Sequence, residues 1–96
     1  MSSPFKAWLT HLPLAQEKFF VVAHGGQWKV RHNDLHLGPY LTSACALRAA
    51  IDEAHNTGRQ GTGAQVFVPV KGGEFRLEWT YGMDPYPARA QGPNPP

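Results

Sequence analysis

Two similar stretches decide the fold of this chain: FVVAHGGQWKVR at residues 20–31 and FVPVKGGEFRLE at residues 67–78. Each consists of an alternating run, a Gly-Gly pair and a second alternating run. Glycine adopts positive φ without a steric penalty, so a Gly-Gly pair suits a tight turn between antiparallel strands. The repeat therefore predicts two similar β-hairpins.

Closing each hairpin at its glycine pair predicts which residues face each other across the strands. In the first hairpin the expected pairs are His24–Gln27, Ala23–Trp28, Val21–Val30 and Phe19–His32, and in the second they are Lys71–Glu74, Val70–Phe75, Val68–Leu77 and Val66–Trp79.

Side chains alternate between the two faces of a strand, and under this register they segregate by character. One face is almost wholly apolar and is the expected core face: Phe19, Val21, Ala23, Trp28, Val30, Val66, Val68, Val70, Phe75, Leu77, Trp79 and Tyr81. The other face is mixed: Phe20, Val22, His24, Gln27, Lys29, Arg31, Phe67, Pro69, Lys71, Glu74, Arg76 and Glu78.

Pro69 complicates the second hairpin, because proline has no N–H to donate to a strand ladder. In a strict two-residue hairpin it would face Arg76 and leave one ladder bond unmade. A four-residue loop over residues 71–74 would turn its nitrogen outward. Pro69 therefore indicates either that the strand of residues 66–71 is an edge strand or that its turn is wider.

Between the hairpins, LHLGPYL at residues 35–41 predicts a short third strand, and residues 42–58 predict a helix. Thr42 or Ser43 is the expected N-cap, and Gly58 suits the end of the helix. The expected apolar stripe is Ala44, Leu47, Ile51 and Ala54. The order ββ(β)αββ predicts a two-layer α+β fold, a mainly antiparallel sheet of two hairpins with one helix on one face.

The chain divides into three zones. Residues 1–17 are expected to be an N-terminal extension that includes a short helix, with Ser3 as cap and Pro4 at its first position. Residues 18–82 form the α+β domain. Residues 83–96 hold five of the nine prolines and predict an extended or disordered tail.

Composition limits the class of protein. No apolar run reaches the ~18–20 residues of a membrane helix, and the N-terminus lacks the pattern of a secretion signal. A single cysteine, Cys45, allows no internal disulfide and suits a cytoplasmic location. The net charge of +2 permits contact with nucleic acid without requiring it.

The end motifs of the domain carry a resemblance. The first hairpin contains His24, Gly25, Gly26 and Trp28, an Ala-rich helix follows, and the closing hairpin runs into YGMDPYP at residues 81–87. This arrangement, HGGxW followed by YGxDPYP, resembles a family of small bacterial domains of unknown function over roughly residues 18–87. The resemblance implies a fold and a bacterial or phage origin, and no catalytic activity.

No catalytic constellation is visible, so we expect a protein that is not an enzyme and has no cofactor. HNDLH at residues 32–36 has two histidines four apart, but on a strand end and turn their rings need not converge on a metal. Cys45 and His55 lie ten positions apart on one helix, which separates them by roughly 15 Å along its axis. They therefore cannot form a nucleophile–base pair.

The mixed sheet face is the candidate contact surface, because a solvated face would be polar throughout. The residues expected to make contact are Phe20, Val22, Lys29, Arg31, Phe67, Lys71 and Arg76. The expected role is a non-enzymatic module that binds another protein or forms a homodimer.

Two alternatives remain open for the same face. The N-terminal segment could fold back and cover it with Phe5, Trp8 and Leu9. It could also bind nucleic acid, since its cations and phenylalanines resemble sheets that stack bases and hold phosphates. Against nucleic acid, Glu74 and Glu78 are expected on this face and lower its charge.

Overall fold

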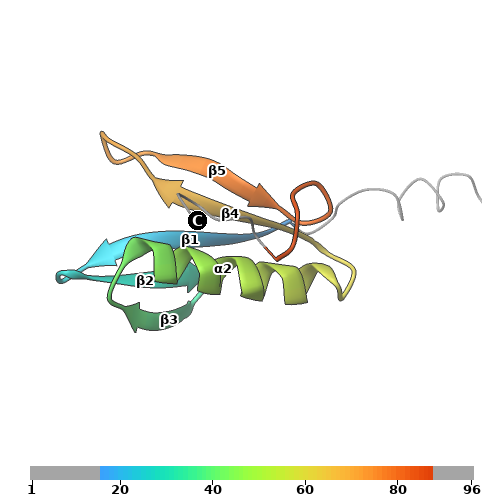
Figure 1. Ribbon diagram of the computed structural model, residues 1–96, viewed down its shortest axis with the longest axis horizontal. Helices are drawn as coiled ribbons and strands as arrows, with labels where there is room; N and C mark the ends of the chain where they lie inside the picture. Colours follow the sequence, from blue (N-terminus) through green and yellow to red (C-terminus); the bar gives the residue numbers. More distant parts are fainter. Residues whose placement is uncertain (1–15, 88–96) are drawn as a thin grey trace, which may run out of the picture.

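The computed structural model describes residues 16–87, and these form one five-stranded sheet with one helix against it. The strands are β1 (Gln16–His24), β2 (Gln27–His32), β3 (Leu35–Tyr40), β4 (Gly63–Pro69) and β5 (Phe75–Thr80), and the helix α2 (Ser43–Gly58) lies between β3 and β4 in sequence. Figure 1 shows α2 crossing one face of the sheet. The predicted α+β class, the two hairpins and the helix on one face are confirmed.

The two hairpins meet through a parallel pair, so the sheet is mixed. Its spatial order is β3-β2-β1-β4-β5, with β1 parallel to β4 and all other neighbours antiparallel. The parallel register places Phe20 beside Phe67, which are the equivalent first residues of the two repeats. A mainly antiparallel sheet was expected, and the parallel junction is a feature that the repeat alone did not predict.

The first hairpin has the expected register: Val21 pairs with Val30, Ala23 with Trp28 and His24 with Gln27. Gly25 and Gly26 form the turn at φ of 59° and 80°, in the left-handed region that glycine adopts readily. The expected third strand is also present as β3.

The second hairpin departs from the expected register. Val68 pairs with Arg76 and not with Leu77, Pro69 pairs with Phe75, and a bulge separates these pairs from the expected Val66–Trp79 pair. The turn has three residues, 71–73, because the N–H of Val70 donates to the carbonyl of Glu74 at 2.8 Å. An odd loop shifts the register by one residue, and the bulge shifts it back.

Pro69 gives a physical reason for the three-residue turn. Because the N–H of Val70 points at β5, the nitrogen of Pro69 points the opposite way, where the pairing of β4 with β1 ends at Phe67. No ladder bond is therefore lost. The turn is wider than two residues, as one alternative expected, but it has three residues and not the four predicted. The other alternative, an edge strand, is wrong, because β4 lies between β1 and β5.

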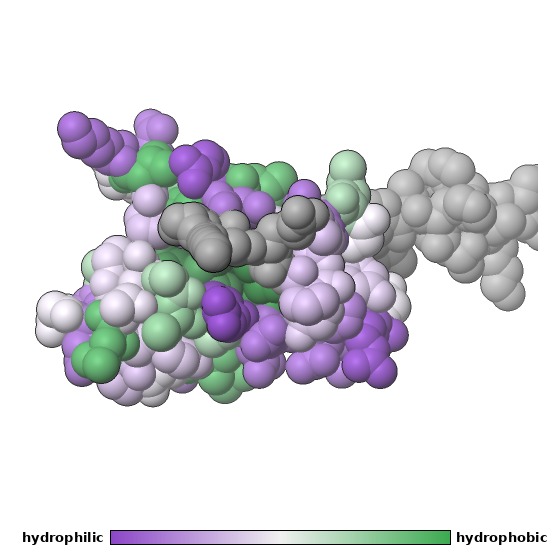
Figure 2. Space-filling view, viewed as in Figure 1, coloured by the Kyte–Doolittle hydropathy of each residue, from purple (hydrophilic) through white to green (hydrophobic). Residues whose placement is uncertain are grey.

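The core lies between α2 and the sheet. Its buried hydrophobic residues are Phe19, Val21, Val30, Ala46, Leu47, Ala50, Ile51, Ala54, Ala64, Val66 and Trp79. The expected helix stripe is wrong at Ala44, which is exposed, while Ala46 and Ala50 are fully buried. Seen from the α2 side, hydrophobic residues show between α2 and the β4–β5 hairpin (Figure 2).

Thr42 caps α2 as expected: its hydroxyl oxygen accepts a hydrogen bond from the N–H of Cys45 at 3.1 Å. We expect Thr42→Ala to lower the free energy of unfolding by about 1 kcal/mol, because one N–H of the first helical turn loses its partner. Urea denaturation measures this loss. Thr42→Ser retains the hydroxyl and is expected to keep most of the wild-type free energy of unfolding. An equal loss for both variants would contradict a capping role.

Candidate functional site

The face of the sheet turned away from α2, which we call the open face, carries the candidate site. In Figure 1 it is the far side of the sheet, behind α2. Strand alternation and the cross-strand registers place the following side chains on it: Lys18, Phe20, Val22, Lys29, Arg31, His36, Gln65, Phe67, Pro69, Phe75 and Leu77. Five of the seven predicted contact residues, namely Phe20, Val22, Lys29, Arg31 and Phe67, belong to this set.

The register shift in the second hairpin corrects the other predictions. Arg76 lies on the α2 side, where it lines a hollow beside Val68 and forms an ion pair of 2.8 Å with Glu78. Phe75 and Leu77, expected in the core, project from the open face and are 40% and 46% exposed. Lys71 lies in the exposed turn of the second hairpin.

Three phenylalanines from three strands form an aromatic cluster on the open face. The ring centres of Phe20 and Phe67 lie 5.1 Å apart in a stacked arrangement, and Phe75 meets Phe20 edge-on at 5.0 Å. Phe20 and Phe67 are half-buried by each other and by their neighbours. The cluster lies away from the main core and gives the open face an apolar centre.

Charge on the open face is of one sign. Lys18, Lys29 and Arg31 project from it along β1 and β2, and Arg31 lies with its guanidinium carbon 5.3 Å from the ring centre of Phe20. All seven acidic residues lie within residues 16–87, and none is a strand residue of this face: Glu17, Asp34, Asp52, Glu53, Glu74, Glu78 and Asp84. The expected acidic contribution of Glu78 is wrong, because Glu78 lines the hollow on the α2 side and forms its ion pair with Arg76 there. Glu74 lies in the exposed turn before β5 and not on a strand of this face.

The open face has two parts. The basic half, on β1 and β2, contains Lys18, Phe20, Val22, Lys29 and Arg31. The apolar half, on β4 and β5, consists of Phe67, Pro69, Phe75 and Leu77. Phe20 and Phe67 pair across the parallel junction, so the two halves meet there.

A pocket of about 350 Å³ opens at one end of the basic half. Its lining residues are Gln16, Lys18, Phe20, Arg31 and Asn33. Asn33 reaches this position from the β2–β3 turn, where its φ of 57° is in the left-handed region that asparagine tolerates better than most residues. The pocket thus combines two cations, two amides and one aromatic ring.

Glu17 lies at the same end of the sheet, on the face opposite to the open face. Its carboxylate lies 2.5 Å from Nε2 of His32, and the amide of Asn33 donates to it at 3.4 Å. The hydrogen bond from His32 holds the pKa of Glu17 below its ordinary value. Since His32 is engaged here and His36 follows Arg31 onto the open face, the two histidines of HNDLH lie on opposite faces.

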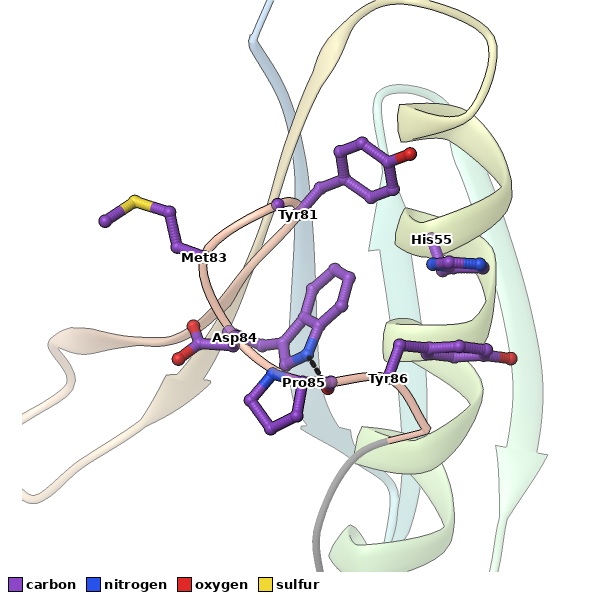
Figure 3. A pocket seen from close by; sticks show the side chains of 8 residues that line it. His55, Tyr81, Met83, Asp84, Pro85 and Tyr86 are labelled. Atoms are coloured by element: carbon purple, nitrogen blue, oxygen red, sulfur yellow. Dashed lines mark hydrogen bonds between the residues drawn. The ribbon is translucent and has the colours of Figure 1, made fainter.

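The YGMDPYP motif forms a second hollow, of about 500 Å³, against the C-terminal half of α2 (Figure 3). The ring of Tyr86 stacks on His55 with centres 3.7 Å apart, and its hydroxyl donates to Asp52 at 2.8 Å. The indole N–H of Trp79 donates to the carbonyl of Pro85 at 3.0 Å, as Figure 3 shows. Asp84, Pro85 and Tyr86, which the sequence predicts to belong to the tail, thus contact the domain.

Polar groups within YGMDPYP, which we call the closing motif, hold it against the domain. Oδ2 of Asp84 accepts a hydrogen bond from the N–H of Thr80 at 2.8 Å. The hydrogen bond that the hydroxyl of Tyr86 donates to Asp52 raises the pKa of that phenol, because ionisation would remove the donated proton. These contacts fasten β5 to α2 and give the motif a structural role.

Within residues 16–87, no three His, Cys, Asp or Glu side chains gather where they could hold a metal ion. Cys45 lies in the first turn of α2 and His55 in its last turn, so the helix keeps them apart. The same part of the chain contains no helix that is both long and apolar enough to span a membrane.

Comparison of the chain with protein-family models, with curated proteins and with solved structures finds no match. The resemblance of the HGGxW and YGxDPYP motifs to small bacterial domains stays a prediction.

Proposed function

We propose that the protein is a non-enzymatic binding module of the bacterial cytoplasm whose contact surface is the open face. Its apolar half contacts another protein chain, in the first place a second copy of this one. The observation that carries this proposal is the exposure of Phe75 and Leu77, 40% and 46%, beside the aromatic cluster. Adjacent exposed apolar side chains on a sheet face are typical of a contact surface.

The division of the open face supports a homodimer. In a two-fold dimer the same patch of both copies meets, so β4–β5 would face β4–β5. The cations would then stay at the margins, because Lys18, Lys29 and Arg31 lie on the other half. Like charges are therefore not forced together. A small domain also buries a low fraction of its surface alone, so a dimer would supply burial that the monomer lacks.

The absence of a reactive constellation among residues 16–87 supports a role without catalysis. The histidines and the cysteine lie apart: His32 contacts Glu17, His55 stacks on Tyr86, and Cys45 is exposed near the start of α2. A general base needs a partner within hydrogen-bond reach, and none of these pairs supplies a nucleophile.

The test is the mass of the full-length protein in sedimentation velocity, at low and high salt and at several protein concentrations. We expect a dimer at both salt concentrations, because an apolar interface is screened little by ions. Phe75→Asp with Leu77→Asp should raise the dimer dissociation constant by about 30-fold or more. Leu41→Asp is the matched control, since Leu41 is 83% exposed and lies outside the open face.

A wild-type monomer at every concentration would contradict the proposal. The alternative that the N-terminal segment covers the open face falls on residues 1–15, which lie outside the described part of the chain. A monomer that begins to associate when residues 1–15 are deleted would favour that alternative over a dimer.

A further inference from the structure

The basic half of the open face has a chemistry that the proposed protein contact does not use. Three cations, Lys18, Lys29 and Arg31, share a surface to which no strand residue contributes an acid. On the α2 side, by contrast, Arg76 is paired with Glu78. A patch of one sign on a protein of low net charge attracts a ligand of the opposite sign.

The pocket beside these cations adds recognition groups other than charge. Gln16 carries an amide that both donates and accepts, and Phe20 contributes part of a ring. The N–H group of Asn33 donates to Glu17, so Asn33 offers the pocket its carbonyl oxygen as an acceptor. A volume of about 350 Å³ is large enough for a small planar group rather than an ion alone. Nucleobases are held by stacking on aromatic rings or guanidinium planes together with hydrogen bonds to their edges, and this lining supplies groups of both kinds.

Arg31 is held in a position that suits stacking. Its guanidinium carbon lies 5.3 Å from the centre of the Phe20 ring, within the range of a cation–π contact, and its side chain remains exposed. An arginine anchored on one side by a ring can offer its other side to a base, because guanidinium planes stack on bases as aromatic rings do.

We propose that the basic half binds single-stranded nucleic acid, with phosphates along Lys18, Lys29 and Arg31 and one base in the pocket lined by Gln16, Phe20 and Asn33. The proposal rests on the open face being a contact surface, yet it uses a different half from the dimer. Duplex nucleic acid fits less well, because its bases are stacked inside and leave the pocket unused. The modest number of cations predicts weak binding with little sequence preference.

The test is fluorescence anisotropy of the full-length protein with a labelled oligothymidylate of about 12 nucleotides, a length of the order of single-strand site sizes. Three phosphate contacts predict a log–log salt slope of about −2, from ~0.7 per contact on single strands. Lys18→Glu with Arg31→Glu should weaken binding by about 10-fold or more at low salt. Arg48→Glu with Arg59→Glu changes net charge equally on exposed residues outside the open face and should have little effect.

Two further measurements isolate the pocket. Arg31→Lys keeps the charge and should leave the salt slope unchanged while weakening binding by about 5-fold or more, because the stacking plane is lost. An oligomer with the same phosphates but abasic sugars should bind the wild type more weakly than oligothymidylate. Circular dichroism of each variant verifies that it is folded.

Three results would overturn the proposal. The first is no binding at low salt, and the second is a loss of affinity in the Arg48/Arg59 control equal to that in the Lys18/Arg31 variant. The third is an affinity for duplex or abasic strands equal to the affinity for oligothymidylate. These failures are distinguishable from failure of the dimer. Phe75→Asp with Leu77→Asp is read by sedimentation and leaves the basic half intact, whereas Lys18→Glu with Arg31→Glu is read by anisotropy and leaves the apolar half intact.

Discussion

Replacing Trp79 by alanine is expected to lower the free energy of unfolding by about 3–5 kcal/mol, the largest loss that we expect from any single truncation within residues 16–87. Trp79 is 3% exposed and lies where β5, α2 and the closing motif meet. Its ring contacts Tyr81 and Tyr86 edge-on, and its indole N–H holds the carbonyl of Pro85. Alanine would therefore open a cavity and release the motif together.

Urea denaturation followed by circular dichroism measures this loss, since the variant lacks one of the tryptophans that fluorescence would report. Leu35→Ala is the control: Leu35 is 63% exposed, and its replacement should change stability by no more than about 0.5 kcal/mol. Trp79→Phe retains an aromatic ring without the N–H, and its loss of stability should lie between those of Trp79→Ala and Leu35→Ala. A loss below about 1 kcal/mol for Trp79→Ala would mean that the closing motif does not depend on this ring.

Gly58→Ala is expected to destabilise the protein by about 1–3 kcal/mol, although alanine is the better helix former. Gly58 is buried at the end of α2, and a Cβ there would come into direct overlap with the ring of Tyr81, beginning at its Cγ. Because Cγ lies on the axis about which the ring turns, rotation of the ring about its Cβ–Cγ bond cannot relieve the overlap. Either Tyr81 must leave or β5 must move.

The loss is measured by urea denaturation, with Asn56→Ala as the matched control. Asn56 is exposed on the same helix, so alanine there should be neutral or slightly stabilising. Combining Gly58→Ala with Tyr81→Ala should recover part of the loss, because the added methyl group then occupies space that the ring vacated. Strict additivity of the two changes would contradict the steric explanation.

Much of this fold follows from local signals. The Gly-Gly turn at residues 25–26 determines the register of the first hairpin, and Thr42 and Gly58 bound the helix where the sequence predicts. In each case the determining residues are neighbours in the chain. Propensity and capping therefore suffice, since no distant contact competes with them.

The second hairpin shows where local signals fail. Its glycine pair predicts the same two-residue turn, yet Pro69 disfavours the matching ladder and the turn takes three residues. The bulge then returns Trp79 to the core. Alternation of side chains counted from the turn cannot detect either change, so the sequence predicts the wrong face for Phe75 and Leu77.

The sequence predicts only part of the candidate site, because only the first hairpin keeps the expected register. Phe20, Lys29 and Arg31 belong to the first hairpin and lie where its register places them. Arg76 does not, because it follows the shifted register of the second. The pocket with Gln16 and Asn33 could not be found from spacing, since it joins a strand start to a turn fifteen or more positions away.

The parallel junction of β1 and β4 also implies an order of assembly. Each hairpin has a short loop and can form early. Pairing of β1 with β4 requires closing a much longer loop, which costs more conformational entropy. Of the four neighbouring strand pairs in residues 16–87, this is the one without a short connection. We therefore expect the β1–β4 pairing in the middle of the sheet to form last, when the two preformed hairpins join.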